Sequence, residues 1–378
     1  MLPAKSIPIE LVEEGRRVMN ICNACRYCEG YCAVFPALER RLEFGEADLT
    51  YLANLCHQCG ACYDACQYAP PHEFQLNFPK TLAAIRRQSY GKYAWPRWFA
   101  AAFEHGALAG GVASAAGLYV FVMLMLPVSG AAGFFAPHAD GEGSFYALLP
   151  HGLMASTYAA IALLVVLALV VGLRRFWRDG GGELRVIANS GALGRAVWDA
   201  LRLKYLQGGG DKCTYPTPHT SSARRWFHHL TFYGFLSCFA ATCVATLYHY
   251  GFGWKAPYPF FSAPVVLGTI GGVGLIAGPI GLLWLRSRRD PTVVEDEHTG
   301  MDTAFLLLLL ANGATGLLLL ALRETAAMGS LLAAHLAVVT GLFLTMPYGK
   351  FVHAVSRLGA LVRYEVERRR PPPPFTAE

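Results

Sequence analysis

Residues 22–32 read CNACRYCEGYC and residues 56–66 read CHQCGACYDAC, so the spacing Cys-x2-Cys-x2-Cys-x3-Cys occurs twice. A cubane iron–sulfur cluster needs four thiolates, and a tight Cys-x2-Cys-x2-Cys loop supplies three of them. In two-cluster ferredoxins the fourth cysteine of each run binds the other cluster. We therefore predict two 4Fe–4S clusters, one bound by Cys22, Cys25, Cys28 and Cys66, and the other by Cys56, Cys59, Cys62 and Cys32.

A structural zinc site and a disulfide framework are the alternatives for these cysteines. Zinc sites pair two Cys-x2-Cys groups around one ion, which leaves the third cysteine of each run without a role. Disulfide frameworks are typical of small secreted domains. The N-terminal sequence MLPAKSIPIELVEEGRRVMN has neither the apolar core nor the cleavage site of a signal peptide. The cysteine segment is therefore expected in the reducing cytoplasm, where thiolates stay free for metal.

The first 90 residues are predicted to form a helical head. Residues 8–20 and 38–55 have a helical spacing of apolar residues, and no alternating pattern typical of strands occurs. The bacterial ferredoxin pattern places proline directly after the fourth cysteine, whereas Pro36 and Pro70 come four residues after it here. These features favour a small α-helical ferredoxin-like domain over the strand-rich ferredoxin fold.

The rest of the chain has the composition of a membrane protein. Of the 378 residues, 54% are hydrophobic and 15% are charged, whereas soluble domains carry about a quarter charged residues. Six segments reach the length of about 20 apolar residues that spans a bilayer; they lie near 105–127, 151–173, 228–250, 263–285, 303–322 and 331–350. The predicted fold class is therefore all-α, with a helical ferredoxin-like domain followed by a six-helix transmembrane bundle. Glycines in the fourth segment permit a close helix approach.

The basic residues predict an orientation. Lys and Arg gather before the first span, in the loop 174–227, after the fourth span and after the sixth, while the opposite loops carry only Lys255 and Arg323. Because cytoplasmic loops are enriched in Lys and Arg, we expect both termini in the cytoplasm, with the spans in the bacterial inner membrane. This placement accounts for the net charge of +6 without nucleic acid as a partner. The predicted domains are the head 1–90, a linker 91–104, the membrane domain 105–355 and a cytoplasmic tail 356–378.

Histidines in the spans point to a second kind of redox centre, because ionisable residues are costly in a membrane. His228 and His249 lie at opposite ends of the third span, and His335 and His353 are 18 residues apart around the sixth. On one continuous helix, 18 residues make five turns, so His335 and His353 would share a face. We predict an inner b-type haem held by His228 and His353 and an outer one held by His249 and His335.

The sequence also allows other ligands for the two haems, and a role without haem for each histidine. His229 adjoins His228 and can take its place as the inner ligand. His151 begins the second span and can replace His249 in the outer pair. Each histidine can also lie in the headgroup layer as an amphipathic anchor without a metal.

Four stretches resemble the tricarballylate/citrate utilization protein B family, and the resemblance covers most of the chain. They are 21–41 (ICNACRYCEGYCAVFPALERR), 51–83 (YLANLCHQCGACYDACQYAPPHEFQLNFPKTLA), 224–250 (RRWFHHLTFYGFLSCFAATCVATLYHY) and 347–358 (PYGKFVHAVSRL). The resemblance implies cluster-ligand roles for the eight cysteines. It also implies that this chain is the membrane partner of an FAD-dependent tricarballylate dehydrogenase. In that role the chain would reoxidise the reduced flavin and pass the electrons to quinone. The last span is similar to that of nitrate reductase gamma subunits, which implies haem ligation by His335 and His353.

Together these features predict a subunit that reduces membrane quinone and acts with a separate cytoplasmic flavoprotein dehydrogenase. The chain has no flavin or nicotinamide fingerprint of its own. A membrane redox sensor is the alternative, although no segment is long enough for an output domain. A transporter is less favoured, because the spans lack an internal repeat and midplane carboxylates. The sequence does not locate the quinone site, but Lys350 and Tyr348 near His353 are candidates.

Overall fold

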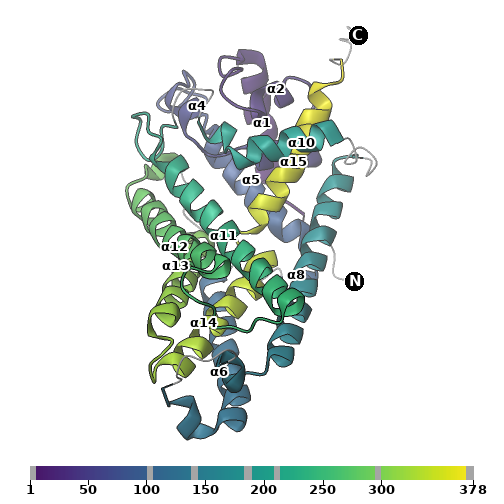
Figure 1. Ribbon diagram of the computed structural model, residues 1–378. Helices are drawn as coiled ribbons and strands as arrows, with labels where there is room; N and C mark the ends of the chain where they lie inside the picture. The colour runs from purple at the N-terminus through teal and green to yellow at the C-terminus, as the bar shows by residue number, and fades with distance from the viewer. Residues whose placement is uncertain are drawn as a thin grey trace.

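The computed structural model describes residues 6–99, 105–137, 144–182, 190–207, 213–293 and 299–371. Throughout this part of the chain the fold is helical, apart from an isolated bridge between Cys213 and Ser221. The N-terminal segment forms five helices: α1 (Ile9–Cys25), α2 (Val34–Leu38), α3 (Glu46–Leu55), α4 (Ala61–Asp64) and α5 (Phe78–Tyr93). Figure 1 shows these helices at one end of the molecule and the long helices at the other. The prediction of an all-α fold with a helical head is confirmed.

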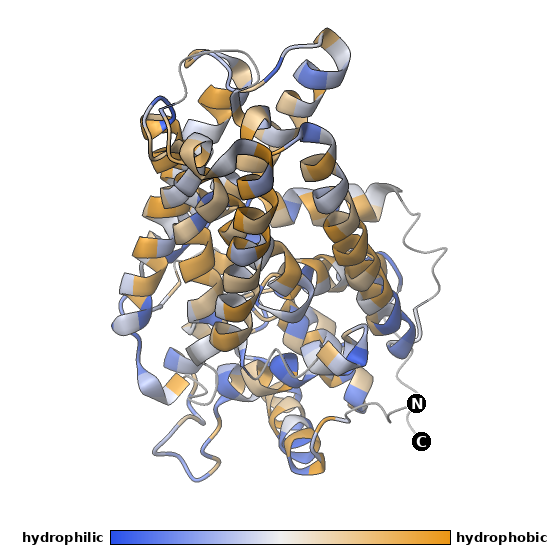
Figure 2. Ribbon diagram, turned by 90° about the horizontal axis from the view of Figure 1, so that it is seen from below, coloured by the Kyte–Doolittle hydropathy of each residue, from blue (hydrophilic) through white to orange (hydrophobic). Residues whose placement is uncertain are grey.

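Within the described residues, six helices are long and apolar enough to cross a membrane, as predicted. They are α6 (Gly106–Phe134), α8 (His151–Asp179), α11 (Ala223–Phe252), α12 (Ala263–Ser287), α13 (Thr299–Leu322) and α14 (Met328–Thr345), with α14 extended by the 3-10 helix η5 (Met346–Tyr348). Figure 2 shows hydrophobic residues along these helices. Apolar side chains such as Tyr119, Leu163 and Ile270 are exposed on their outer faces. Such faces suit lipid, because helices that are hydrophobic all round are either buried or membrane-spanning.

The head is built from three separated parts of the chain rather than from the first 90 residues alone. Helix α15 (Val352–Arg368) lies within the predicted tail and packs into the head, where Leu361 and Tyr364 are buried in the same core as Leu52 and Ile85. Helix α10 (Ser190–Leu201), from the loop 174–227, packs on α15. The segment predicted as a cytoplasmic tail, 356–378, therefore contains a helix that packs in the head core, while 372–378 lie outside the described residues.

Two predicted helices are interrupted in the structure. The stretch 38–55 is not one helix, because α2 ends at Leu38 and α3 begins only after Gly45, with Glu46 in its first turn, where a carboxylate is favourable. The continuous helix assumed from His335 to His353 is also interrupted, since α14 stops at Thr345 and α15 starts at Val352. Pro347 lacks the N–H that would continue the helix. The argument that His335 and His353 share one helical face is therefore wrong.

Glycines allow α11 and α12 to pack closely, as the sequence indicated. A Cβ atom on Gly274 would lie 2.8 Å from the carbonyl oxygen of Leu230, and one on Gly234 would lie 3.0 Å from the carbonyl carbon of Gly274. These atoms belong to backbone, which cannot move aside as a flexible side chain can. The backbones of the two helices therefore meet where neither residue has a side chain.

We expect Gly274→Ala to destabilise the membrane part by about 1–3 kcal/mol, the usual cost of overpacking a filled interface. Gly268→Ala on the same helix is the matched control, because its Cβ would meet only Ala241 at an ordinary 3.8 Å. Thermal unfolding of both variants in detergent measures the difference. Equal stability of the two variants would show that the close contact is not a constraint.

Candidate metal centres

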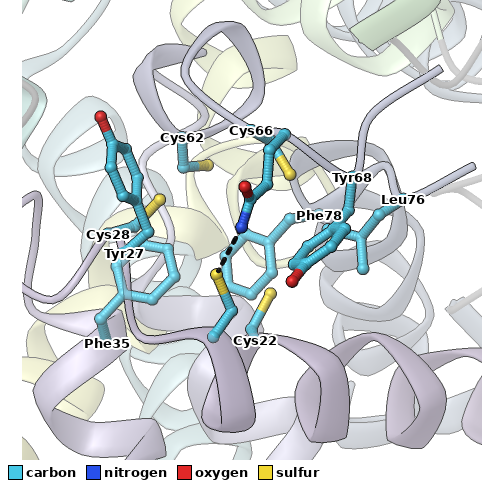
Figure 3. A pocket seen from close by; sticks show the side chains of 11 residues that line it. Cys22, Tyr27, Cys28, Phe35, Cys62, Cys66, Tyr68, Leu76 and Phe78 are labelled. Carbon is cyan, nitrogen blue, oxygen red and sulfur yellow. Dashed lines mark hydrogen bonds between the residues drawn. The ribbon is translucent and has the colours of Figure 1, made fainter. Parts of the chain in front are cut away.

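The first predicted set of cysteines surrounds one cavity in the head (Figure 3). Cys22 and Cys25 come from the end of α1, Cys28 from the turn that follows, and Cys66 from the segment after α4. Burial raises the pKa of the Cys22 thiol, and the nearby sulfurs of Cys66, Cys28 and Cys25 raise it further in that order. The side-chain amide of Gln67 lies 3.8 Å from the sulfur of Cys25. The four thiols of this set thus lie together, although they come from both motifs.

The second predicted set also lies together. Burial, followed by the charges of Cys59 and Cys56, raises the pKa of the Cys32 thiol well above its usual value. The Cys62 thiol is buried beside Cys59, Cys56 and Cys32, and its pKa is likewise raised. Cys62 also lines the first cavity, so the two sets adjoin. This grouping matches the exchanged fourth cysteines, and the ligand roles themselves stay a prediction.

The donor atoms suit iron–sulfur clusters. All eight cysteines are free thiols rather than disulfides, and soft thiolates are the ligands that bind Fe–S clusters. Among the described residues, no three His, Cys, Asp or Glu side chains are grouped closely enough to hold a single metal ion. A cubane spreads its four thiolates over four irons, so its ligands lie farther apart than those of one tetrahedral zinc. The arrangement is therefore compatible with clusters.

Three arginines hold the loop that carries Cys56 and Cys59. Arg86 of α5 and Arg357 of α15 both donate to the carbonyl oxygen of Cys56, at 2.7 Å and 2.8 Å. Arg224 of α11 donates to the carbonyl oxygen of Gln58 at 2.5 Å. Burial, followed by the charge of Arg86, lowers the pKa of Arg357 to about 10, so its guanidinium stays charged at neutral pH. The second set of thiols is therefore surrounded by positively charged guanidinium groups.

The inner histidine pair is brought together. The rings of His228 on α11 and His353 on α15 have centroids 6.2 Å apart and planes at 77°. A metal ion about 2 Å from a nitrogen of each ring places the centroids about 6 Å apart. His353 Nδ1 lies 2.5 Å from the carbonyl oxygen of Lys350, a contact that fixes the ring and leaves Nε2 for a metal. The pair fits axial haem ligation.

His229, the alternative inner ligand, lies elsewhere. Its ring packs against those of Trp226 and Tyr233. Of the two neighbouring histidines, His228 is the one whose ring contacts His353. The geometry thus favours His228 over His229.

The outer pair is not brought together. The ring of His249 stacks on His151 with centroids 3.6 Å apart, and Nδ1 of His335 lies 3.0 Å from the hydroxyl of Thr315. Helix α11 packs mainly on α12, whereas α14 packs mainly on α6 and α13. The helices that carry His249 and His335 are therefore not close neighbours, and the predicted outer haem has no support from the geometry.

Comparison with known proteins shows to which family this chain belongs. Residues 15–92 match the model of the "Citrate utilization protein B Fer4-like domain", and residues 104–374 match that of "Citrate utilization protein B". The chain belongs to the citrate utilization protein B family. It is 49% identical over 359 residues to Citrate utilization protein B of Escherichia coli, which covers 94% of this chain and 93% of the relative. No solved structure matches the chain.

The comparison bears on two of the predictions. It confirms the resemblance seen in the sequence, and the Fer4-like match supports iron–sulfur clusters in the head of this family member. A further cysteine outside the two motifs, Cys213, also contacts the second cysteine loop. Its thiol is buried and donates to the carbonyl oxygen of Cys59 at 3.1 Å, while the N–H of Thr214 donates to the same oxygen. No local pattern marks this contact, because it joins segments far apart in the chain.

Proposed function

We propose that this citrate utilization protein B family member carries electrons from a reduced flavoprotein dehydrogenase to membrane quinone. In this proposal, electrons pass through two 4Fe–4S clusters in the head and then through a b-type haem. The dehydrogenase acts on tricarballylate, citrate or a related acid and docks on the head at the cytoplasmic face of the bacterial inner membrane. When bound, the clusters and the haem each accept a single electron, and so separate the pair that a reduced flavin releases.

One observation carries the proposal: the helices with the inner histidines also hold the second cysteine loop. Arg357 lies one helical turn after His353 and donates to the carbonyl oxygen of Cys56. Arg224 lies one turn before His228 and donates to the carbonyl oxygen of Gln58. Each guanidinium thus connects a histidine helix to the loop around the second cluster site. This supports electron transfer between that cluster and a haem at the histidine pair.

The surroundings of the two cluster sites and the haem site support an order in which electrons would pass through them. The first cavity lies at the edge of the head, where Tyr27 is 66% exposed, so a partner can approach it. The second set adjoins the first through Cys62 and adjoins the histidine helices through Cys56. Electrons would therefore enter at the first cluster, continue to the second and reach the haem.

Reconstitution of the electron path tests the proposed function. The purified protein is placed in liposomes with decylubiquinone, and the substrate-reduced flavoprotein dehydrogenase is added under anaerobic conditions. We expect quinone reduction only when the dehydrogenase and this protein are both present. Equal quinone reduction by the dehydrogenase alone would contradict the proposal.

Arg357→Gln should lower the reduction potential of the second cluster and leave that of the first unchanged. A unit charge about 10 Å away is worth about 1.7 kcal/mol at an effective dielectric constant of about 20, or roughly a 20-fold change in the ratio of reduced to oxidised cluster. EPR-monitored redox titration measures both potentials.

Two control variants separate charge from packing. Arg357→Lys keeps the charge and should retain most of the potential. Arg368→Gln removes a charge eleven residues farther along the same helix, about 16 Å along its axis, where Arg368 pairs with Glu365, so the potential should change much less. An unaltered second cluster in Arg357→Gln would show that this arginine does not set its potential.

A further inference from the structure

A second cavity lies where the head meets the long helices. Its volume is about 60 Å³, and its walls come from α5, the cysteine loop, the end of α12, the start of α13 and the segment before α15. Its lining includes Gln58, Ala83, Tyr90, Arg286, Asp302 and Lys350. This space is large enough for several water molecules or for the carbonyl edge of a ring. None of the predicted cluster or haem ligands lines it.

The cavity touches the surroundings of two predicted redox centres. The backbone N–H of Gln58 lies 3.4 Å from the sulfur of Cys56, and its side-chain oxygen accepts from Arg86 at 2.5 Å. On another wall, the carbonyl oxygen of Lys350 holds the ring of His353. A single residue, Gln58, would therefore separate a ligand in this cavity from Cys56 of the second cluster site. A single residue, Lys350, would separate it from His353 of the haem site.

The cavity also lies at one end of the membrane-spanning helices. Arg286 is in the last turn of α12 and Asp302 is in the first turn of α13. A membrane quinone has an apolar tail and a polar ring, so its ring reaches this level while its tail remains among the lipids. The position thus suits a lipid-soluble redox substrate rather than a soluble one.

The charged groups in the walls suit a quinone that is being reduced. Asp302 bridges two cations, with Lys350 Nζ at 2.9 Å and Arg286 Nη1 at 3.3 Å. Arg86, Arg87 and Arg289 add further guanidinium groups to the lining. A quinone oxygen gains negative charge when the ring accepts an electron, and nearby cations stabilise that charge in a site of low dielectric constant.

We propose that this cavity binds the quinone headgroup and is the site where quinone is reduced. The proposal rests on the proposed function, because the electrons come from the flavoprotein through the second cluster. Two electrons arrive one after the other, and two protons come from water at the head side. Together they convert the two carbonyl groups of the quinone into the two hydroxyl groups of the quinol. Asp302 positions Lys350 and Arg286 toward the ring.

Two variants test the site by different means. Ala83→Leu fills the cavity without a change of charge, and Ala84→Leu is its control, one position along α5 and not in the lining. Asp302→Asn breaks the bridge at the start of α13, and Glu324→Gln beyond the end of that helix is its control. Each variant is reduced with dithionite and mixed with decylubiquinone or with ferricyanide. The absorbances of the haem and the clusters report how fast each centre is reoxidised.

We expect the quinone-driven rate to fall at least about tenfold in Asp302→Asn, as for the loss of one charge-assisted hydrogen bond. It should fall by at least about as much in Ala83→Leu, because the larger side chain takes up the space of the headgroup. The ferricyanide-driven rate should not change, and both controls should match the parent protein. If the parent reacts with quinone and both cavity variants react equally fast, the cavity is not the site, although the proposed function stands. If the parent is oxidised by ferricyanide but not by quinone, the proposed acceptor and the site are both wrong.

Discussion

Replacement of Cys66 by serine is expected to remove one cluster and to leave the other. The lost cluster should be the one whose remaining ligands are Cys22, Cys25 and Cys28, although Cys66 belongs to the second motif. The structure places Cys66 beside these three thiols, in a cavity that Cys62 also lines. A cubane that loses one of its four thiolates is left with an open iron and becomes labile.

Iron analysis and EPR of the dithionite-reduced variant measure this effect. Cluster iron should fall from about eight to about four atoms per chain. Cys32→Ser should remove the other cluster, because Cys32 lies beside Cys56 and Cys59. Cys213→Ser is the control: that thiol is buried beside the thiol of Cys59 and donates to the carbonyl oxygen of Cys59, but it lies outside both cysteine motifs, and both clusters should remain. Loss of the second cluster in Cys66→Ser would disprove the exchanged ligation.

Replacement of His353 by alanine is expected to remove the b-type haem. An axial ligand on each side holds the iron of such a haem, and His353 faces His228 across 6.2 Å. His228→Ala should have the same effect. The visible spectrum of the reduced protein measures haem content, and the EPR signals of both clusters report whether the head remains folded.

The outer histidines provide the matched controls. His249→Ala and His335→Ala each remove a histidine from a long helix, but the described contacts do not join these two rings. Both variants should therefore keep the haem spectrum of the parent protein, with one haem per chain. A haem that persists in His353→Ala and disappears in His335→Ala would show that the inner pair is not the site.

The features that could be predicted from the sequence depend on local pattern. The cysteine spacing indicated two clusters with exchanged ligands, and the structure groups the same thiols. Hydropathy and length located all six long helices, because a span depends on about 20 consecutive residues. The glycines of the fourth span indicated close packing, and a backbone contact at Gly274 bears this out.

The features that could not be predicted depend on contacts between distant segments. Position along the predicted spans placed His249 and His335 at the same level but could not show that α11 and α14 pack mainly on different partners. The helix breaks at Pro347, so that α15 changes direction and packs in the head. This change of direction brings Arg357 to Cys56 and His353 to His228. Neither contact leaves a sequence pattern, because each joins residues more than a hundred positions apart.

The reduced spectrum of the anaerobically purified protein tests most directly whether this chain is an electron carrier. We expect EPR signals of two 4Fe–4S clusters, about eight cluster irons per chain and a sharp b-type α-band after addition of dithionite. Both sets of signals should decay when quinone is added. Bound zinc with a featureless visible spectrum would contradict the proposed function.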